Sequence, residues 1–432
     1  MSSFGKDIFL LIRSSTITRS LDVLRGVVVM KFVTPDMLGL LDVVNQAKAL
    51  AKYGDLGFGA VVEREYNFTA VKDISAAEKI RNTGYSGELV LTFFLTALVA
   101  ISSFWLSTSM LITVAILSAA LGLGLTKFVK LLNLQLRIKK NFADFARYQS
   151  MLAIFTTVMV IATVPFMGAL SPLIFQPIAL LIVALMMFRK IGMDLQFQLP
   201  GHELKRQLRV GLKLGLITVL FGAGIYTERL LILHYYSATE LGFFAFSAFF
   251  LNFFQTFIYD VVRPVMPDVR EALGRGDTDQ LAKDLMKPML LTIAVTALAI
   301  FALKIFVEFA ILHFFTKYTG AIPSFHLLIY NLYFIASSAF MGFILYSPKV
   351  ERTRWVYYSH IVYIVVLAGV AFLTRGSHQF HIFCTAFIIA NSLRALTQNF
   401  AGFSYFLRGY KLALSLFLIN ILPALVIFYL IL

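Results

Sequence analysis

Long runs of apolar residues, separated only by short charged segments, follow one another along the whole chain. A helix that crosses the hydrocarbon core of a bilayer needs about 20 such residues, and most of the runs have that length. The short alternating segments that a membrane β-barrel would show are not visible. The pattern therefore predicts an all-α polytopic membrane protein. Its expected spans lie near 16–33, 37–65, 84–105, 108–129, 143–167, 169–188, 209–233, 238–264, 288–312, 322–346, 354–374, 378–407 and 411–432.

The composition supports this class of protein. Of the 432 residues, 59% are hydrophobic and only 14% are charged, and the mean hydropathy is +0.81. A soluble domain carries about one-quarter charged residues, so the composition argues against a water-soluble enzyme. The single cysteine, Cys384, excludes a disulfide within the chain and a Cys-based metal site. Because no nucleotide-binding loop, catalytic triad or histidine cluster is visible, we expect a transporter with no catalytic residues, no metal and no cofactor.

The net charge of +15 is unevenly distributed between the segments that connect the expected spans. Basic residues gather in alternate connecting segments, whereas the other segments contain only Lys317 and Arg375. Positively charged segments stay on the cytoplasmic side of a membrane, so the N-terminus is expected in the cytoplasm. This role in orientation accounts for the basic excess, and we expect no nucleic-acid partner.

The stretches around Gly39 and Gly242 resemble each other at an offset of 203 positions. Each is a short turn between two expected spans, and the offset corresponds to six spans. Two halves of like orientation follow, and transporters built from such repeats place the substrate path between the halves. We therefore expect pseudo-symmetric six-helix halves at 1–200 and 201–407, and an additional membrane helix at 408–432.

Seven basic residues remain inside the expected spans, namely Arg25, Lys31, Lys48, Lys52, Arg229, Lys304 and Arg394. A charge at the bilayer centre costs about 2.5–3.5 kcal/mol on insertion scales, so these side chains should face a protein interior or a wet cavity. Helical periodicity places Asp22 with Arg25, and Lys48 with Lys52, on shared polar faces. We infer a central, water-filled cationic cavity that binds an anionic substrate. Its candidate contacts are Arg25, Lys48, Lys52, Arg394, Arg229, Lys304 and Asn45.

Internal pairing is the alternative explanation for these charges. It would join Asp22 to Arg25, Lys48 or Lys52 to Asp55, Glu228 to Arg229, and Lys304 to Glu308. Buried carboxylates can also exchange protons, so some acids are candidates for coupling transport to H⁺ or Na⁺. These candidates are Asp22, Asp55, Glu228 and Asp260. The glycine-rich stretch 54–59 has no preceding strand, and it predicts a helix bend or close helix packing rather than a nucleotide site.

Several motifs resemble those of Wzx-type polysaccharide flippases. Met37-Leu-Gly-Leu, Lys52-Tyr-Gly-Asp-Leu-Gly-Phe-Gly59 and Glu63-Arg-Glu65 resemble the second-helix pattern of that family. Thr227-Glu-Arg229, Glu240-Leu-Gly-Phe and Arg263-Pro-Val-Met-Pro267 are similar to its seventh and eighth helices. The family belongs to the multidrug/oligosaccharidyl-lipid/polysaccharide (MOP) exporter superfamily, which also contains drug exporters and lipid II flippases. Two departures are Glu228, where the family often has Asp, and a thirteenth span after the usual twelve.

The resemblance implies a substrate and a location. It implies that the chain moves an undecaprenyl-diphosphate-linked oligosaccharide, such as an O-antigen, capsule or exopolysaccharide repeat unit, by alternating access. The direction would be from the inner to the outer leaflet of the bacterial cytoplasmic (inner) membrane, with membrane lipid and a polysaccharide polymerase as further partners. Arg and Lys suit a diphosphate because they form charge-assisted hydrogen bonds.

Three other functions are alternatives to this one. A lipid II flippase would bind the same diphosphate, and a multidrug exporter of the superfamily would be expected to show acidic rather than basic cavity residues. A membrane polymerase or ligase fits less well, because the longest expected outer segment, 313–321, is short.

Overall fold

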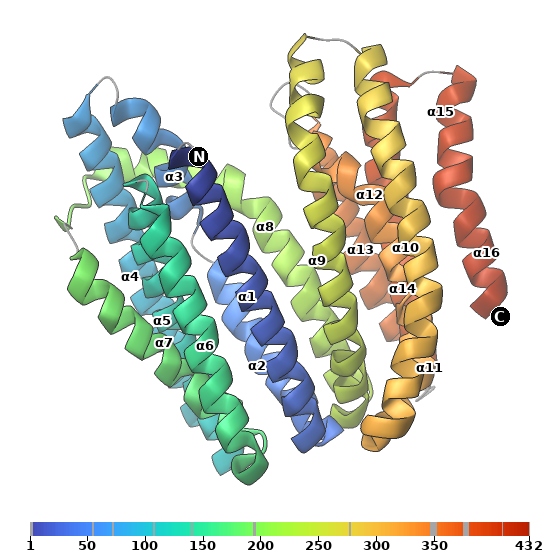
Figure 1. Cartoon of the computed structure of the whole chain (residues 1–432), viewed down its shortest axis with the longest axis horizontal. Helices are drawn as coiled ribbons and strands as arrows, with labels where there is room; N and C mark the ends of the chain where they lie inside the picture. The colour runs from blue at the N-terminus through green and yellow to red at the C-terminus, as the bar shows by residue number, and fades with distance from the viewer. Residues whose placement is uncertain are drawn as a thin grey trace. The chain divides into compact units, whose positions relative to one another are not determined.

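The computed structural model describes residues 3–53, 56–70, 73–106, 109–139, 141–192, 196–275, 278–345, 352–374, 380–407 and 409–431. No β-strand occurs in these ranges, and Figure 1 shows the helices. They are α1 (Ser3–Phe32), α2 (Pro35–Tyr53), α3 (Phe58–Ala70), α4 (Ile74–Leu106), α5 (Met110–Ile138), α6 (Phe142–Met167), α7 (Leu170–Ile191), α8 (Gly201–Tyr235), α9 (Ala238–Arg275), α10 (Thr278–Phe314), the 3₁₀ helix η1 (Thr316–Ala321), α11 (Ile322–Leu328), α12 (Asn331–Leu345), α13 (Thr353–Leu373), α14 (Phe380–Phe406), α15 (Gly409–Leu416), the π-helical η2 (Phe417–Ile421) and α16 (Leu422–Ile431).

The helices confirm the prediction of an all-α polytopic membrane protein. In the described ranges, eight helices are long and apolar enough to cross a membrane, or nine if a pair bent by 43° after Leu328 counts as one span. Helices α1 and α8 are longer than most of these, and they differ by carrying several charged residues. The expected span 37–65 is broken in the structure into α2 and α3.

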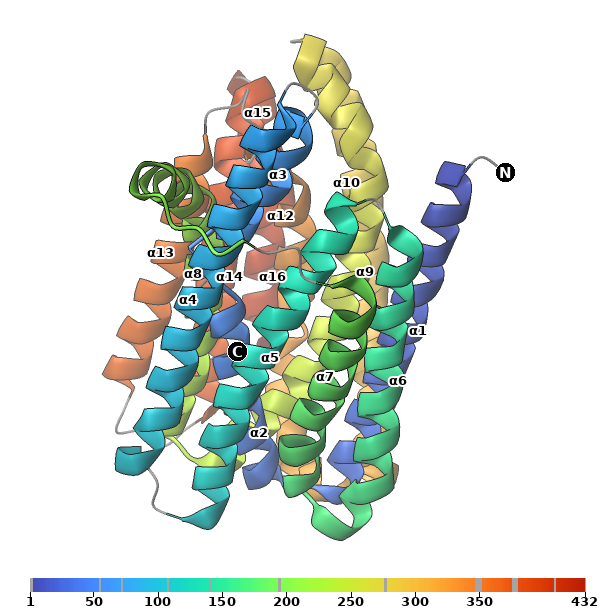
Figure 2. The ribbon, with the colours of Figure 1, turned by 90° about the vertical axis from the view of Figure 1, so that its left-hand side faces the viewer.

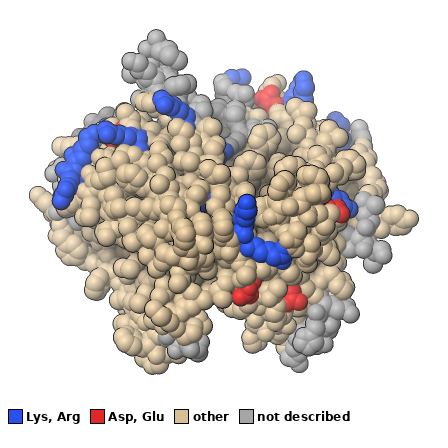
Figure 3. Space-filling model, turned by 60° about the horizontal axis from the view of Figure 1, so that its bottom comes forward, with Lys and Arg blue, Asp and Glu red and all other residues tan. Residues whose placement is uncertain are grey.

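Large apolar side chains cover much of the outer surface. Phe104 is 84% exposed, Phe166 is 87% exposed and Leu298 is 75% exposed. A soluble monomer rarely exposes large contiguous apolar patches, whereas a lipid-facing surface requires them. Figure 3 shows one face of the molecule on which charged side chains are few and uncharged residues dominate.

The contacts between helices divide the chain into two units, of which unit 1 contains Met1–Val33 and Leu40–Tyr226. Within it α1 packs on α6, α5 packs on α7, and α4 packs on α3 and α5, as Figure 2 shows for α4 to α7. Leu132 of α5, Tyr148 of α6, and Val183 and Met187 of α7 are all buried in one hydrophobic cluster. The cluster holds α5, α6 and α7 together around a common core.

The break between α2 and α3 is held by a close approach of two backbones. Leu56 and Gly57 have φ values of +48° and +79°, which are left-handed conformations that glycine adopts most easily. A Cβ atom on Gly57 would lie 2.2 Å from the carbonyl oxygen of Gly211 in α8. A Cβ atom on Gly211 would lie 2.4 Å from the carbonyl oxygen of Leu56. The prediction of a helix bend or close helix packing in this glycine-rich stretch is therefore confirmed at Gly57, as close packing.

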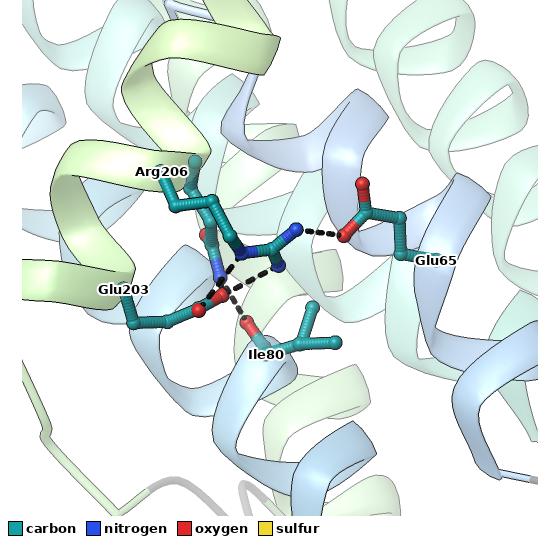
Figure 4. Close-up of polar contacts among 5 residues, drawn as sticks. Glu65, Ile80, Glu203 and Arg206 are labelled. Carbon is teal, nitrogen blue, oxygen red and sulfur yellow. Dashed lines mark hydrogen bonds and ion pairs between the residues drawn. The ribbon is translucent and has the colours of Figure 1, made fainter. Parts of the chain in front are cut away.

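A polar network fastens the first turns of α8 to α3 and α4 (Figure 4). Arg206 Nη1 lies 2.8 Å from Glu65 Oε2, and its Nε and Nη2 donate to the two carboxylate oxygens of Glu203 at 2.9 and 2.7 Å. The side-chain amide of Gln207 donates to the backbone oxygen of Ile80 at 3.0 Å. Because Arg206 is bidentate to one carboxylate and also reaches a second, it fixes the position of α8 within unit 1.

Unit 2 contains Thr34–Gly39 and Thr227–Leu432. Within it α14 packs on α12 and α13, and α9 packs on α10. The C-terminal helices are fastened by buried polar groups, since Asn399 donates to the side-chain oxygen of Asn420 at 2.8 Å and the hydroxyl of Tyr333 donates to the backbone oxygen of Ile419 at 3.0 Å.

The two turn glycines that the repeat aligns lie against each other in unit 2. A Cβ atom on Gly39 would lie 2.6 Å from the backbone oxygen of Ala238 and 3.0 Å from the backbone nitrogen of Gly242. A Cβ atom on Gly242 would lie 1.7 Å from the backbone oxygen of Pro35. The similarity between the two stretches therefore coincides with a shared packing requirement, because neither turn tolerates a side chain at its glycine.

Replacing Gly57 should destabilise unit 1. Gly57→Ala places a methyl group against the carbonyl of Gly211 and forces alanine into a left-handed conformation, which together should cost about 2–3 kcal/mol. Thermal unfolding followed by far-UV circular dichroism measures the loss. Gly369→Ala is the matched control, because nothing lies within 4 Å of its added Cβ. Because Gly369 lies within α13, in its last turns, Gly369→Ala should raise stability by up to about 1 kcal/mol. Equal effects of the two substitutions would contradict the close-approach account.

The Arg206 network should make the stability of unit 1 depend on pH. Burial acts to raise the pKa of Glu203, but hydrogen bonds from Arg206 and Gln207 outweigh it and hold the pKa below its usual value. A carboxylate of this kind stabilises the folded state above its unfolded pKa of 4.5, and this stabilisation is lost as the pH falls through the folded pKa.

Glu203→Gln should therefore lower the unfolding temperature at pH 7 and reduce its decline between pH 6 and pH 3. Asp279→Asn, at an exposed position in the first turn of α10, is the control and should keep the full decline. An unchanged pH profile for Glu203→Gln would contradict this role of the network.

Candidate functional site

Unit 1 contains an open cavity of about 780 Å³. Its walls come from α1, α5, α6 and α7, with Asn45 of α2 also contributing. Arg25, Asp22 and Asn45, which the sequence predicts as site residues on two separate helices, line this one cavity. The structure therefore brings together three of the predicted residues within unit 1.

One face of α1 supplies a charged wall of the cavity. It carries five lining residues at intervals of one or three positions, namely Ser15, Thr18, Arg19, Asp22 and Arg25. Arg25 Nη2 lies 2.8 Å from Asp22 Oδ1, so this expected pair is present. The side chain of Asp22 is 49% exposed and that of Arg25 is 21% exposed, so the pair remains open to solvent or ligand.

One face of α5 supplies the second charged wall, through Thr126, Lys130, Asn133 and Arg137. Arg137 Nη1 lies 2.7 Å from Glu63 Oε1 of α3. The sequence analysis places Lys130 and Arg137 in a charged connecting segment, because the expected span ends at 129. The helix continues to Ile138, so the residues project from the same helix face. Their spacing of four, three and four residues is the signal that could have identified them.

A buried carboxylate behind this wall was missed by the sequence analysis. Glu88 of α4 is 1% exposed and lies 3.9 Å from Lys127 Nζ and 3.8 Å from Lys130 Nζ. The side chain of Lys127 is 2% exposed and that of Lys130 is 30% exposed, so Glu88 lies near one buried and one partly exposed lysine. The nearby carboxylate offsets part of the cost of holding the Lys127 ammonium group in the interior.

The lining of the cavity is predominantly cationic. Four basic side chains, Arg19, Arg25, Lys130 and Arg137, line it together with a single carboxylate, Asp22. Glu63 and Glu88 compensate part of this charge from outside the lining. A lining with four bases and one acid suits an anionic ligand, because charged donors bind phosphate or carboxylate oxygens strongly.

Unit 2 contains a second polar cluster, built around Glu228. Arg229 and the hydroxyl of Tyr363 both donate to the carboxylate of Glu228, one to each oxygen. Arg229 also lies over the ring of Phe244, 5.0 Å from its centroid. Glu228 and Arg229 are buried at 5% and 3% exposure, so the expected pairing of these two residues is confirmed in an interior setting.

Arg394 joins this cluster without a carboxylate of its own. Its guanidinium carbon lies 5.7 Å from the centroid of the Tyr363 ring. In the part of the chain that the structure describes, no acidic side chain pairs with Arg394, and its buried Nε has no hydrogen-bond partner. Internal pairing therefore accounts for Arg229 but not for Arg394, where a π-face partly replaces the missing anion.

The remaining predicted site residues lie away from these two clusters or outside the described part of the chain. Lys304 is on α10 of unit 2. Its expected partner Glu308 instead lies near His326 of α11, with 3.1 Å between Glu308 Oε2 and His326 Nε2. The side chains of four predicted residues lie outside the described part of the chain; these are Lys48, Lys52, Asp55 and Asp260. Within the described residues, no group of three or more His, Cys, Asp or Glu side chains is placed to hold a metal ion.

Comparison with known proteins identifies the fold. No protein-family model and no curated protein matches the sequence. The lipid II flippase MurJ, in an inward closed conformation, matches with a TM-score of 0.72 at 13% identity, over 98% of this chain and 98% of that chain. An inward-facing multidrug resistance MATE family transporter of the MOP superfamily matches with a TM-score of 0.70 at 13% identity, over 94% of this chain and 99% of that chain.

A further solved structure has the same fold. It is a MOP superfamily transporter from Pyrococcus furiosus, for which reverse polarity of the binding pocket suggests a different function, and it matches with a TM-score of 0.60 at 15% identity. The match covers 95% of this chain and 96% of that chain. The chain thus has the 12-helix fold of MOP-superfamily transporters, as the sequence predicted.

Removing the carboxylate of Glu228 should destabilise unit 2 strongly. Glu228→Gln leaves Arg229 buried without its anion, which should cost about 3 kcal/mol or more. Cys384 of α14 is buried in the same unit, so the rate at which a thiol-reactive dye labels it on heating measures the loss. Glu308→Gln is the control, because the Glu308 side chain is 42% exposed and its partnership should contribute no more than about 1 kcal/mol. Equal labelling rates in the Glu228→Gln and Glu308→Gln variants would show that the Glu228 cluster does not stabilise unit 2.

Proposed function

We propose that this protein is a flippase that moves an undecaprenyl-diphosphate-linked oligosaccharide across the bacterial cytoplasmic membrane. Its fold is shared with transporters, among them a lipid II flippase. A substrate of this kind has a compact anionic diphosphate, a polar sugar chain and an apolar tail. The protein would bind the diphosphate and sugar in a wet interior, while the tail remains in lipid.

The cationic cavity of unit 1 is the observation that carries the proposal. Four basic residues and one carboxylate line a space of about 780 Å³ inside a membrane protein, where each charge is costly. An anionic substrate would repay that cost when it binds. We assign diphosphate contact first to Arg25, whose half-buried guanidinium faces the cavity although it is paired with Asp22.

Arg394 and Arg229 of unit 2 are the second candidate contacts. Arg394 keeps a buried nitrogen without a partner in the described structure, so it can accept an anionic ligand without breaking an ion pair. Arg229 would have to leave Glu228, which makes it the weaker candidate. Lys304, Lys48, Lys52 and Asn45 remain proposed contacts. Asp22, Asp55, Glu228 and Asp260 remain proposed coupling groups for H⁺ or Na⁺.

The charge of the cavity also separates the proposal from its alternatives. A cationic drug, the substrate expected of the multidrug exporter alternative, would be repelled by a lining with one acid and four bases. A lipid II flippase remains the closer alternative, because its substrate would present the same diphosphate to the same residues. The identity of the sugar chain then decides between them, together with whether a polysaccharide polymerase is a partner.

Loss of Arg25 should slow transport of the lipid-linked sugar. In proteoliposomes containing undecaprenyl-diphosphate-linked oligosaccharide, Arg25→Gln should reduce leaflet transfer by about tenfold or more, since a charge-assisted hydrogen bond contributes about 1.5–3 kcal/mol. Arg394→Gln should have a similar effect. Arg13→Gln is the matched control, because Arg13 lies on the same helix as Arg25 and is exposed outside the cavity lining.

Two outcomes would reject these assignments. Full transfer by the Arg25→Gln and Arg394→Gln double variant would remove both residues from the substrate path. Transport of a cationic dye by the unaltered protein, with no transfer of any lipid-linked sugar, would instead show that the protein is a drug exporter.

A further inference from the structure

The cavity of unit 1 has walls of different chemistry. Every charged residue of the lining belongs to α1 or α5. The walls from α6 and α7, which pack on α1 and α5, contribute only uncharged residues: Phe145, Gln149, Leu152, Ala153, Thr156, Gln176 and Leu180. This separation by helix means that a bound molecule would meet the charged side chains on α1 and α5, and neutral amides with apolar surface on α6 and α7.

The glutamines of the neutral wall have unused hydrogen-bonding capacity. In the described part of the structure, neither Gln149 nor Gln176 forms a hydrogen bond with another protein group. Asn133, on the adjoining face of α5, has a buried side-chain oxygen that also lacks a partner. Buried polar atoms in native proteins are nearly always satisfied, so the Asn133 oxygen should be bonded to water or to a ligand, and the partly buried glutamines beside it are free to bond the same ligand.

The chemistry of a carboxamide restricts the ligand. Each amide both donates and accepts hydrogen bonds, whereas a phosphate oxygen only accepts. Hydroxyl and acetamido groups also donate and accept, and they therefore use both ends of an amide. Phe145, Leu152 and Leu180 add apolar surface between the polar groups, against which the C–H face of a sugar ring can pack.

We infer that the α6 and α7 wall is a binding site for an uncharged sugar ring, recognised by Gln149 and Gln176 through its hydroxyl or acetamido groups. The inference rests on the proposed function, in which the cations of α1 and α5 hold the diphosphate that is joined to this sugar. The volume of about 780 Å³ lies within the range of about 300–1,000 Å³ that is usual for small-molecule sites, so a sugar ring and a diphosphate fit together.

The test compares two lipids that differ only in the sugar. Binding of radiolabelled undecaprenyl-diphosphate-N-acetylglucosamine and of sugar-free undecaprenyl diphosphate is measured with the purified full-length protein. The variant Gln149→Met/Gln176→Met keeps the side-chain size and removes the hydrogen bonds. Gln280→Met, at an exposed position of α10, is the matched control. Circular dichroism melting establishes that each variant is folded, and the two single variants replace the double variant if it does not fold.

The double variant should bind the glycosylated lipid about tenfold more weakly, as expected for the loss of two hydrogen bonds, and each single variant about threefold more weakly. Binding of the sugar-free lipid should change by less than about twofold, and the control should bind both lipids normally. Equal weakening for the two lipids, or an unchanged preference for the glycosylated one, would overturn the inference.

A phosphate-free sugar separates failure of the site from failure of the proposed function. If the unaltered protein binds neither lipid, the proposed function is rejected. Binding of chitotriose then tests whether the sugar site exists without it. Chitotriose binding that is lost in Gln149→Met/Gln176→Met would retain the site. No chitotriose binding by the unaltered protein would remove the site as well.

Discussion

The cost of placing a charge inside a membrane protein is the constraint on which the rest of the structure depends. A guanidinium or ammonium group in an apolar interior needs a carboxylate, an aromatic face or water around it. Carboxylates serve in two places, where Glu88 lies near two lysines and where Glu228 pairs with Arg229. An aromatic face serves in another, where Arg394 lies against Tyr363. The cavity of unit 1 is the third solution, because it gathers cations around a space that can hold water or an anion.

Close backbone packing is the second constraint, and it acts through glycine. Gly57 allows α3 to begin at a sharp turn against Gly211, and Arg206 then fixes the same part of α8 to Glu65 and Glu203. The glycine-rich pattern predicts a bend or close packing at 54–59, but the partner lies about 150 residues away in the chain. A pattern along one helix cannot identify which other helix approaches it, because that depends on the packing of the whole unit.

Hydropathy predicts the helices well because a membrane span must be long and apolar. It predicts their ends less well, and this matters for the site. Helix α5 remains helical to Ile138 beyond its apolar part, so Lys130 and Arg137 line the cavity rather than a connecting segment. Pairs within one helix, such as Asp22 with Arg25, follow from spacing alone. Pairs between helices, such as Glu308 with His326, do not.

The two units satisfy their charges differently, and this difference bears on how a substrate would be bound. In unit 2 the carboxylate of Glu228 is occupied on both oxygens, so a ligand there gains little except from Arg394. In unit 1 the charged pairs remain partly open and border amides that have no protein partner in the described structure. Binding energy is available where polar groups are preorganised and unsatisfied, because a ligand then replaces water without breaking protein contacts. Unit 1 is therefore where we expect recognition of the polar head group to be concentrated, while the Glu228 cluster serves first to keep unit 2 folded.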